Sequence, residues 1–113
     1  MEASVDRTLA ALAEPTRRRV IELLRAGPRR AGELAEALSM SRPAMSRHLR
    51  VLRRAGLVDE DALEEDARAR VYRLEREPFL ELHEWLDEVE AFWSEQLHAF
   101  KEHAERQARG GRP

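Results

Sequence analysis

Residues 39–58, SMSRPAMSRHLRVLRRAGLV, constrain the fold more than any other part of the chain. The stretch holds five arginines and one histidine, yet apolar or small residues recur every third or fourth position, at Met45, Leu49, Leu52 and Gly56. At helical periodicity these four positions share one side, and most of the arginines fall on the other. The pattern predicts a helix with one side for a core and the other for anions.

The charges of the chain are strongly segregated along its length. Residues 15–56 carry eleven arginines against three glutamates, a balance of +8, whereas residues 58–105 carry sixteen acids against five bases, a balance of -11. The formal net charge of only -2 conceals this division. We therefore expect the N-terminal half to bind a polyanion and the C-terminal half to stay away from phosphates.

Length and composition narrow the class of protein. A chain of 113 residues suits one domain, small enough to gain stability from dimerisation. It has no cysteine, so disulfides, thiolate metal sites and cysteine nucleophiles are excluded. We expect neither a membrane span nor a secretory signal, and hence a cytoplasmic protein.

Four helices are expected in the first half of the chain. Residues 4–13 have Ser4 as a candidate N-cap and Val5, Leu9 and Leu12 on one side. Two further helices lie within residues 14–27 and 28–40, and the fourth follows a turn and a Ser41 cap. Two helices joined by a short turn, the second rich in arginine, indicate a helix-turn-helix.

The outward side of the fourth helix is the predicted DNA contact. A recognition helix enters the major groove with its N-terminal part, so Arg42, Pro43, Ser46 and Arg47 are expected to reach base edges. Arg50, Arg53 and Arg54 lie further along and are expected to contact phosphates. His48 lies at the margin of the inward side, which favours a structural or phosphate-bonding role over base reading.

Residues 57–74 differ in composition from the helical segments before them. The segments LVDED and RVYRL carry β-branched and aromatic residues around a polar connection, which predicts a two-stranded hairpin. A hairpin directly after a recognition helix is a wing. The segments EPTRRRVIELL, GELAEALSMSRPAMSRHLRVLRRAGLV and RVYRL, in this order, resemble the ArsR-type (arsenic-repressor-like) family of bacterial transcriptional regulators.

That resemblance implies a dimeric repressor that binds a palindromic operator and is released by an effector. The chain departs from the metal-sensing members because Ala35 and Ala37 stand where those members carry cysteines. The expected wing tip, residues 64–66, is acidic and should avoid phosphate, which leaves Arg68 and Arg70 as the wing contacts. Some relatives with such a C-terminal helix act without metal, so we assign no cofactor.

The last long segment predicts a helix with a wide apolar stripe. Apolar residues and one glutamine follow steps of three and four, at Phe79, Leu82, Leu86, Val89, Trp93, Gln96 and Phe100. The core of so small a domain is not large enough to bury the apolar side of so long a helix. We therefore expect a homodimer interface formed by this helix and the first one, using Leu9, Leu12, Leu82, Leu86, Val89, Trp93, Gln96 and Phe100.

Parts of the sequence suggest two other functions. His83, His98 and His103 suggest a histidine-based metal-responsive repressor, but Ser94 stands where the second ligand pair would begin. The acidic C-terminal half suggests a protein-interaction module, which would leave the arginine-rich helix without a role. An enzyme is not expected, because the chain has no glycine-rich phosphate loop and no supported nucleophile–base set.

The predicted fold class is mainly α with a small β-hairpin, a winged helix-turn-helix. One domain should span residues 1–106, with the helix-turn-helix at about 31–56, the wing at about 57–74 and the dimerisation helix at about 78–105. Residues 107–113 are expected to form a disordered tail.

Overall fold

The computed structural model describes the backbone of residues 2–63 and 66–110, and the side chains of residues 3–62 and 70–110. The chain divides into two compact units, Met1–Leu82 and His83–Pro113. The single domain expected over residues 1–106 stays a prediction. The boundary falls inside the last helix, whose first turn contributes Pro78 and Phe79 to the first unit.

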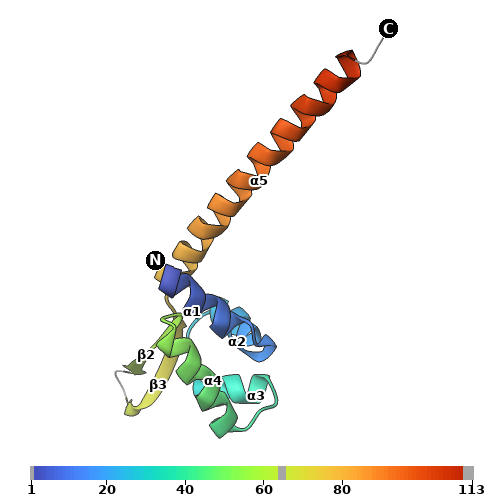
Figure 1. The fold of residues 1–113 in the computed structure, drawn as a ribbon. Helices are drawn as coiled ribbons and strands as arrows, with labels where there is room; N and C mark the ends of the chain where they lie inside the picture. Colours follow the sequence, from blue (N-terminus) through green and yellow to red (C-terminus); the bar gives the residue numbers. More distant parts are fainter. Residues whose placement is uncertain (1, 64–65, 111–113) are drawn as a thin grey trace. The chain divides into compact units, whose positions relative to one another are not determined.

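The elements follow one another with short connections (Figure 1). In chain order they are α1 (Glu2–Leu12), α2 (Pro15–Arg25), β1 (Arg29–Arg30), α3 (Ala31–Ala37), α4 (Arg42–Arg54), β2 (Val58–Leu63), β3 (Asp66–Leu74) and α5 (Glu77–Gly110).

Side-chain oxygens cap two of the helices. The Glu14 carboxylate accepts a hydrogen bond of 3.1 Å from the Arg17 amide at the start of α2, and Ser41 Oγ accepts one of 3.2 Å from the Ala44 amide at the start of α4. The Ser41 cap is confirmed. The Ser4 cap is wrong, because α1 already begins at Glu2 and Ser4 lies inside its first turn.

Two arginines from α2 complete the C-terminal end of α1. Arg17 Nε donates to the Ala11 carbonyl at 2.5 Å, and Arg18 Nη1 donates to the Leu12 carbonyl at 2.6 Å. The last carbonyls of a helix lack partners within it and carry partial negative charge. The two guanidinium groups supply both donors and charge, and thereby join α1 to α2.

The strands form a three-stranded antiparallel sheet in the order β1-β3-β2. The expected hairpin had two strands. The third is a two-residue strand in which Arg29 pairs with Tyr72 and Arg30 with Val71. A segment of two residues is too short to show a strand pattern in the sequence. It is a strand because β3 runs beside it and pairs with it.

The core lies between α2, α3 and α4 and the base of the sheet. The inward side of α4 is confirmed, because Met45, Leu49 and Leu52 are at most 1% exposed. Their neighbours in the core include Val20, Leu24, Leu34, Leu57 and Val58.

The buried line of α1 consists of Val5, Thr8 and Ala11, whereas Leu9 is 42% exposed. Leu9 lies at one flank of this line, where it is accessible for the predicted dimer interface.

The last helix is longer than expected, since α5 has 34 residues and continues through residues 107–110. The assignment of these four residues to a tail is wrong. Residues 104–109, AERQAR, are strong helix formers, and the described part of the helix runs through Gly110. In the second unit the helix exposes Trp85, Leu86, Phe92, Trp93, Leu97 and Phe100.

Among the described residues, no helix combines the length and apolar character that crossing a membrane requires.

The buried Thr8 hydroxyl generates a stability prediction. Thr8 is fully buried, and its Oγ1 has no hydrogen-bond partner among the side chains and backbone groups that the structure describes. A buried polar group without a partner destabilises the fold, so Thr8→Val should raise the free energy of unfolding by about 1 kcal/mol in urea titrations.

A matched variant controls for the loss of a hydroxyl as such. The Thr16 hydroxyl is hydrogen-bonded to Glu14, so Thr16→Val should lower the free energy of unfolding. A destabilised Thr8→Val variant would show that the hydroxyl does have a partner.

Candidate nucleic-acid interface

The side of α4 opposite the core is a row of exposed polar and basic side chains. Arg42, Pro43, Ser46 and Arg47 are exposed in its first half, and Arg50 and Arg54 in its second. Within the described residues, no carboxylate forms an ion pair with Arg47, Arg50 or Arg54. Because the opposite side is locked into the core, this row is held outward and its charge is not neutralised locally.

Arg42 lies nearest the turn between α3 and α4. A Cβ atom placed on Gly32 would come within 2.5 Å of Arg42 Nη2, so the guanidinium group lies close to the backbone of α3. The turn itself places Ser39 at a φ of 53°, in the left-handed region. Arg42, at the leading end of α4, therefore lies next to α3.

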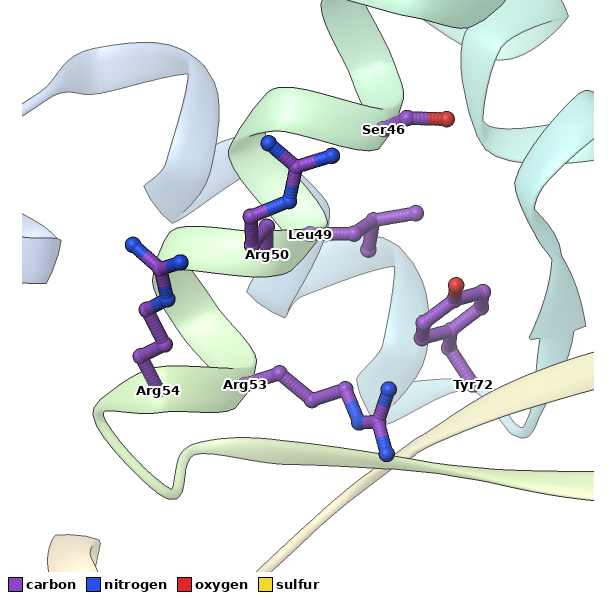
Figure 2. A pocket seen from close by; sticks show the side chains of 6 residues that line it. All are labelled: Ser46, Leu49, Arg50, Arg53, Arg54 and Tyr72. Carbon is purple, nitrogen blue, oxygen red and sulfur yellow. The ribbon is translucent and has the colours of Figure 1, made fainter.

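A hollow of about 460 Å³ lies between α4 and the sheet. It is lined by Ser46, Leu49, Arg50, Arg53, Arg54 and Tyr72. Figure 2 shows Arg50 and Arg54 pointing away from the strands, whereas Arg53 reaches toward them. The hollow thus combines two hydroxyl groups with free guanidinium groups, a combination that suits phosphate oxygens.

Sequence reasoning missed Tyr72 as part of this site. Alternation along β3 places Tyr72 on the same side as Arg70, and this was the available signal. Burial, followed by a hydrogen bond to Glu60 and the Glu60 charge, raises the pKa of Tyr72. The phenol therefore remains a neutral hydrogen-bonding group.

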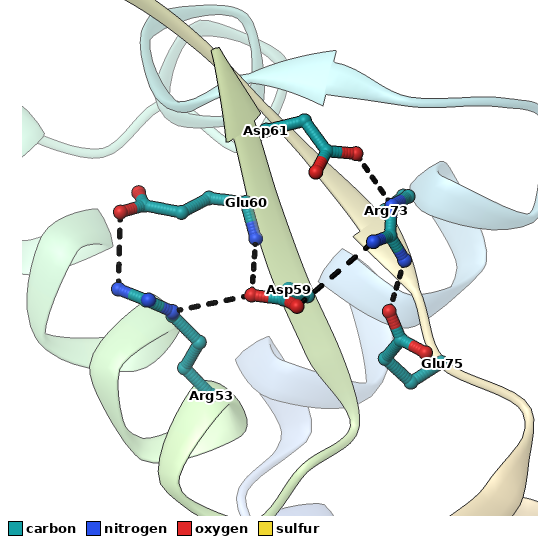
Figure 3. A network of polar contacts seen from close by, with 6 residues as sticks. All are labelled: Arg53, Asp59, Glu60, Asp61, Arg73 and Glu75. Atoms are coloured by element: carbon teal, nitrogen blue, oxygen red, sulfur yellow. Dashed lines mark hydrogen bonds and ion pairs between the residues drawn. The ribbon is translucent and has the colours of Figure 1, made fainter.

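Arg53 belongs to the wing and not to the free arginine row. Its guanidinium lies 3.1 Å from Glu60 Oε1 and 3.7 Å from Asp59 Oδ1 (Figure 3). The expected phosphate contact by Arg53 stays a prediction, and such a contact would compete with the two carboxylates that β2 brings beside the last turn of α4.

A second arginine neutralises the rest of this acidic strand. Arg73 Nε donates to Asp61 Oδ2 at 2.6 Å, and the same guanidinium pairs with Asp59 and Glu75 (Figure 3). The hydrogen bonds to Asp61 and Glu75 raise the pKa of Arg73. These pairs are partly exposed, so each adds little to stability, but together they compensate the carboxylates that flank the arginine row.

His48 is partly buried and lies apart from the exposed row of α4. Its Nδ1 is 3.5 Å from Arg17 Nη1 and 3.7 Å from Glu14 Oε2, at the beginning of α2. Burial alone raises the pKa of Glu14, but amide hydrogen bonds from Thr16 and Arg17 and the attraction of His48 outweigh it, so the pKa is lowered. The position of His48 favours a structural role in joining α4 to α2.

The other residues that the sequence predicted for DNA or dimer contacts lie on β3, α1 and α5. Arg70 is exposed on β3, while the Arg68 side chain and the tip at residues 64–65 lie outside the described residues. Leu9, Leu12 and Leu82 belong to the first unit, and Leu86, Val89, Trp93, Gln96 and Phe100 to the second. Each unit therefore carries part of the expected dimer interface.

The histidines of α5 pair with acids on the same helix. His83 Nε2 lies 3.3 Å from Asp87 Oδ2, and His98 Nε2 lies 3.0 Å from Glu102 Oε1. In the part of the chain that the structure describes, no three histidine, aspartate or glutamate side chains gather around a common point where a metal ion would bind.

Two helices joined by a tight turn, with an arginine-bearing second helix and an antiparallel wing behind it, define the class of winged helix-turn-helix DNA-binding proteins. Residues 14–60 match the family described as bacterial regulatory protein, arsR family. The chain is 44% identical over 95 residues to the HTH-type transcriptional regulator Rv2034 of Mycobacterium tuberculosis, covering 83% of this chain and 82% of that protein. The chain belongs to the ArsR family of transcriptional regulators.

Solved structures have the same fold. An ArsR-like transcriptional regulator from Rhodococcus sp. RHA1 superposes with a TM-score of 0.76 and 28% identity, over 89% of this chain and 92% of that one. The homodimeric winged helix-turn-helix domain of Mb0332 from Mycobacterium bovis superposes with a TM-score of 0.60 and 25% identity, over 86% and 84% of the two chains.

The lowered pKa of Glu14 predicts a pH dependence of stability. A carboxylate whose pKa falls on folding stabilises the folded protein at every pH above the ordinary pKa of the group, 4.5. This contribution is lost as the pH drops through the lower pKa of the folded state. Glu14→Gln keeps a side-chain oxygen at the cap but removes the charge. The wild type should be more stable than this variant at neutral pH, and the difference should vanish well below 4.5.

The measurement is the urea midpoint of the wild type and of Glu14→Gln across this pH range. Because all other groups titrate in both proteins, their contributions cancel in the difference. A difference that stays constant with pH would show that the charge of Glu14 contributes nothing.

Proposed function

We propose that the chain is a transcriptional repressor that binds a palindromic operator as a homodimer, with α4 in the major groove. The observation that carries the proposal is the outward row of α4, in which Arg47, Arg50 and Arg54 have no carboxylate partner among the described residues. DNA phosphates and guanine edges supply the anions and acceptors that such a row lacks.

Within this proposal the two halves of α4 have different tasks. Arg42, Pro43, Ser46 and Arg47 read base edges, because the N-terminal part of a recognition helix goes deepest into the groove. Arg50, Arg54 and the hollow at Tyr72 contact phosphates. Ser41 combines its cap with a backbone contact, His48 supports the helix from behind, and Arg68 and Arg70 contact DNA from the wing.

The proposed homodimer uses the apolar stripe of α5 together with Leu9 and Leu12 of α1. The exposed tryptophan, phenylalanine and leucine side chains of the second unit need a cover that one α5 helix does not provide for itself. The homodimeric Mb0332 domain is consistent with this assembly. Two recognition helices must then lie about 34–36 Å apart to meet successive major grooves.

Repression follows from occupancy, because a dimer that covers an operator excludes other proteins from the same stretch of DNA. The proposed activity is binding alone, without a catalytic step, and it takes place in the cytoplasm, where bacterial DNA lies. The residues that carry it span α1 to α5, so both units are required.

Substitutions in the arginine row should separate base reading from phosphate binding. Arg47→Ala should weaken operator binding by about 1–3 kcal/mol and relax base preference at one position if the contact is bidentate to guanine. Arg54→Ala should weaken all duplexes alike and make the salt dependence shallower. Selection from random duplex DNA, followed by fluorescence anisotropy titrations at several salt concentrations, measures both effects.

Arg25→Ala is the matched control, because it removes the same charge from α2, where Arg25 already pairs with Glu22 at 2.8 Å. It should leave affinity and specificity unchanged. If Arg47→Ala and Arg54→Ala behaved like this control, α4 would not be the DNA-binding helix.

A charge in the apolar stripe of α5 should abolish the dimer. Trp93 is 58% exposed and forms an edge-to-face pair with Phe92, with ring centroids 5.7 Å apart. Trp93→Glu would place a charge against apolar neighbours of the partner, which is strongly unfavourable without a counter-charge. We expect monomers in sedimentation experiments and loss of operator binding, although no DNA-facing residue has changed.

Ala91→Glu adds the same charge on the opposite side of α5 and should retain both the dimer and DNA binding. A folded, monomeric Trp93→Glu variant that binds the full operator with wild-type affinity would refute the role of α5 in operator recognition.

A further inference from the structure

A second hollow lies on the other flank of α4, within the first unit. Its volume is about 390 Å³, and it is formed by residues of α1, α2 and α4. The lining residues are Arg7, Ala10, Ala11, Arg17, Val51, Arg54 and Ala55. No acidic side chain is among them.

The hollow has an apolar floor and a basic rim. Ala10, Ala11, Val51 and Ala55 line it with methyl and isopropyl groups. Val51 is 38% exposed, although the core-facing side of α4 runs through Met45, Leu49 and Leu52. The core therefore does not account for a branched apolar residue at this position beside the arginine row.

Three helices supply the guanidinium groups of the rim. Arg17 is held in place by its hydrogen bonds to the carbonyls of Ala11 at 2.5 Å and Ala10 at 3.5 Å, and these uncharged partners leave its positive charge in place. Arg7 and Arg54 approach from α1 and α4, and no described carboxylate forms an ion pair with either. A cation would be repelled here, whereas an anion would meet donors from more than one side.

We propose that this hollow binds a small organic anion, a carboxylate carried on a compact apolar body. The volume lies in the range of small-molecule sites, about 300–1,000 Å³, and the surface combines apolar contacts with a few converging charged donors. Inorganic phosphate matches the rim but leaves the apolar floor without a contact. A neutral apolar molecule matches the floor but leaves the guanidinium groups without an acceptor.

The hollow stays open in the proposed dimer. At about 100° per residue, Arg7 lies on one flank of the buried line of α1 and Leu9 on the other, while Ala10 lies on the side that faces away from this line. A partner helix that packs on Leu9 and Leu12 therefore leaves the Arg7 side free for a ligand.

Arg54 connects this site to DNA, because it lines this hollow and also the hollow beside Tyr72, which Figure 2 shows. A bound carboxylate would engage its guanidinium group and remove it from phosphate. This consequence rests on the proposed function: the anion should weaken operator binding, and by reciprocity DNA should weaken anion binding. The site itself does not depend on DNA binding.

The first experiment measures binding to the DNA-free protein by nuclear magnetic resonance titration. Phenylacetate is the probe, and phenylacetamide and inorganic phosphate are the controls that lack the charge or the apolar body. Phenylacetate should shift amide signals at the end of α1 and the second half of α4 and saturate at millimolar concentration, whereas the controls should bind at least about tenfold more weakly. Equal shifts with phosphate, or none with phenylacetate, would overturn the site.

Two variants locate the probe. Arg7→Gln should weaken phenylacetate binding by about tenfold, the effect of losing one charge-assisted hydrogen bond. Arg50→Gln, which changes only the hollow beside Tyr72, should bind phenylacetate like the wild type. Loss of binding in Arg50→Gln with retention in Arg7→Gln would place the anion in the other hollow and refute the assignment.

The second experiment adds DNA. Phenylacetate should lower the operator affinity of the wild type but leave that of Arg7→Gln unchanged, and without phenylacetate the two should bind the operator equally. If the wild type does not bind any selected duplex, the proposed function fails while the titration without DNA still decides the site. If it binds DNA and phenylacetate together without mutual weakening, the regulatory role of Arg54 is refuted.

Discussion

The packing of one side of α4 into the core is the interaction on which the rest of the molecule depends. Met45, Leu49 and Leu52 are essentially inaccessible to solvent, and their burial fixes the rotation of the helix about its axis. Rotation in turn decides which residues face outward. A row of guanidinium groups that no local carboxylate neutralises is tolerable on a surface, because water solvates it until a polyanion arrives.

Arginine serves three purposes in this small chain, and the surroundings of each residue decide which one applies. Arg17 and Arg18 satisfy the last carbonyls of α1, and Arg53 and Arg73 compensate carboxylates of the wing. Arg54 lines two hollows and has no carboxylate partner among the described side chains. The acidic strand β2 could otherwise repel DNA beside the recognition helix. Its pairing with Arg53 and Arg73 compensates these carboxylates.

The second unit differs from the first in the exposure of its apolar side chains. Along α5 the apolar side chains lie exposed on a single helix, whereas the first unit buries a continuous core. A surface of this kind is stable in water when a second apolar surface covers it. Dimerisation therefore serves two ends in our proposal: it buries the stripe of α5, and it sets the distance between two recognition helices.

The sequence by itself determined what depends on local chemistry. Ser41 caps α4, helical periodicity identified the inward positions Met45, Leu49 and Leu52, and alternation located the strands of the wing. Only the tertiary structure decided the rest, because it depends on which distant groups meet. The pairing of β1 with β3, the exposure of Leu9 and the two hollows that share Arg54 arise between segments far apart in the chain. The ion pair of Arg53 with Glu60, seven residues away, depends on the path of β2 beside α4. Periodicity reports which side of a helix is apolar, but a partner's position follows from packing, which no short stretch of sequence contains.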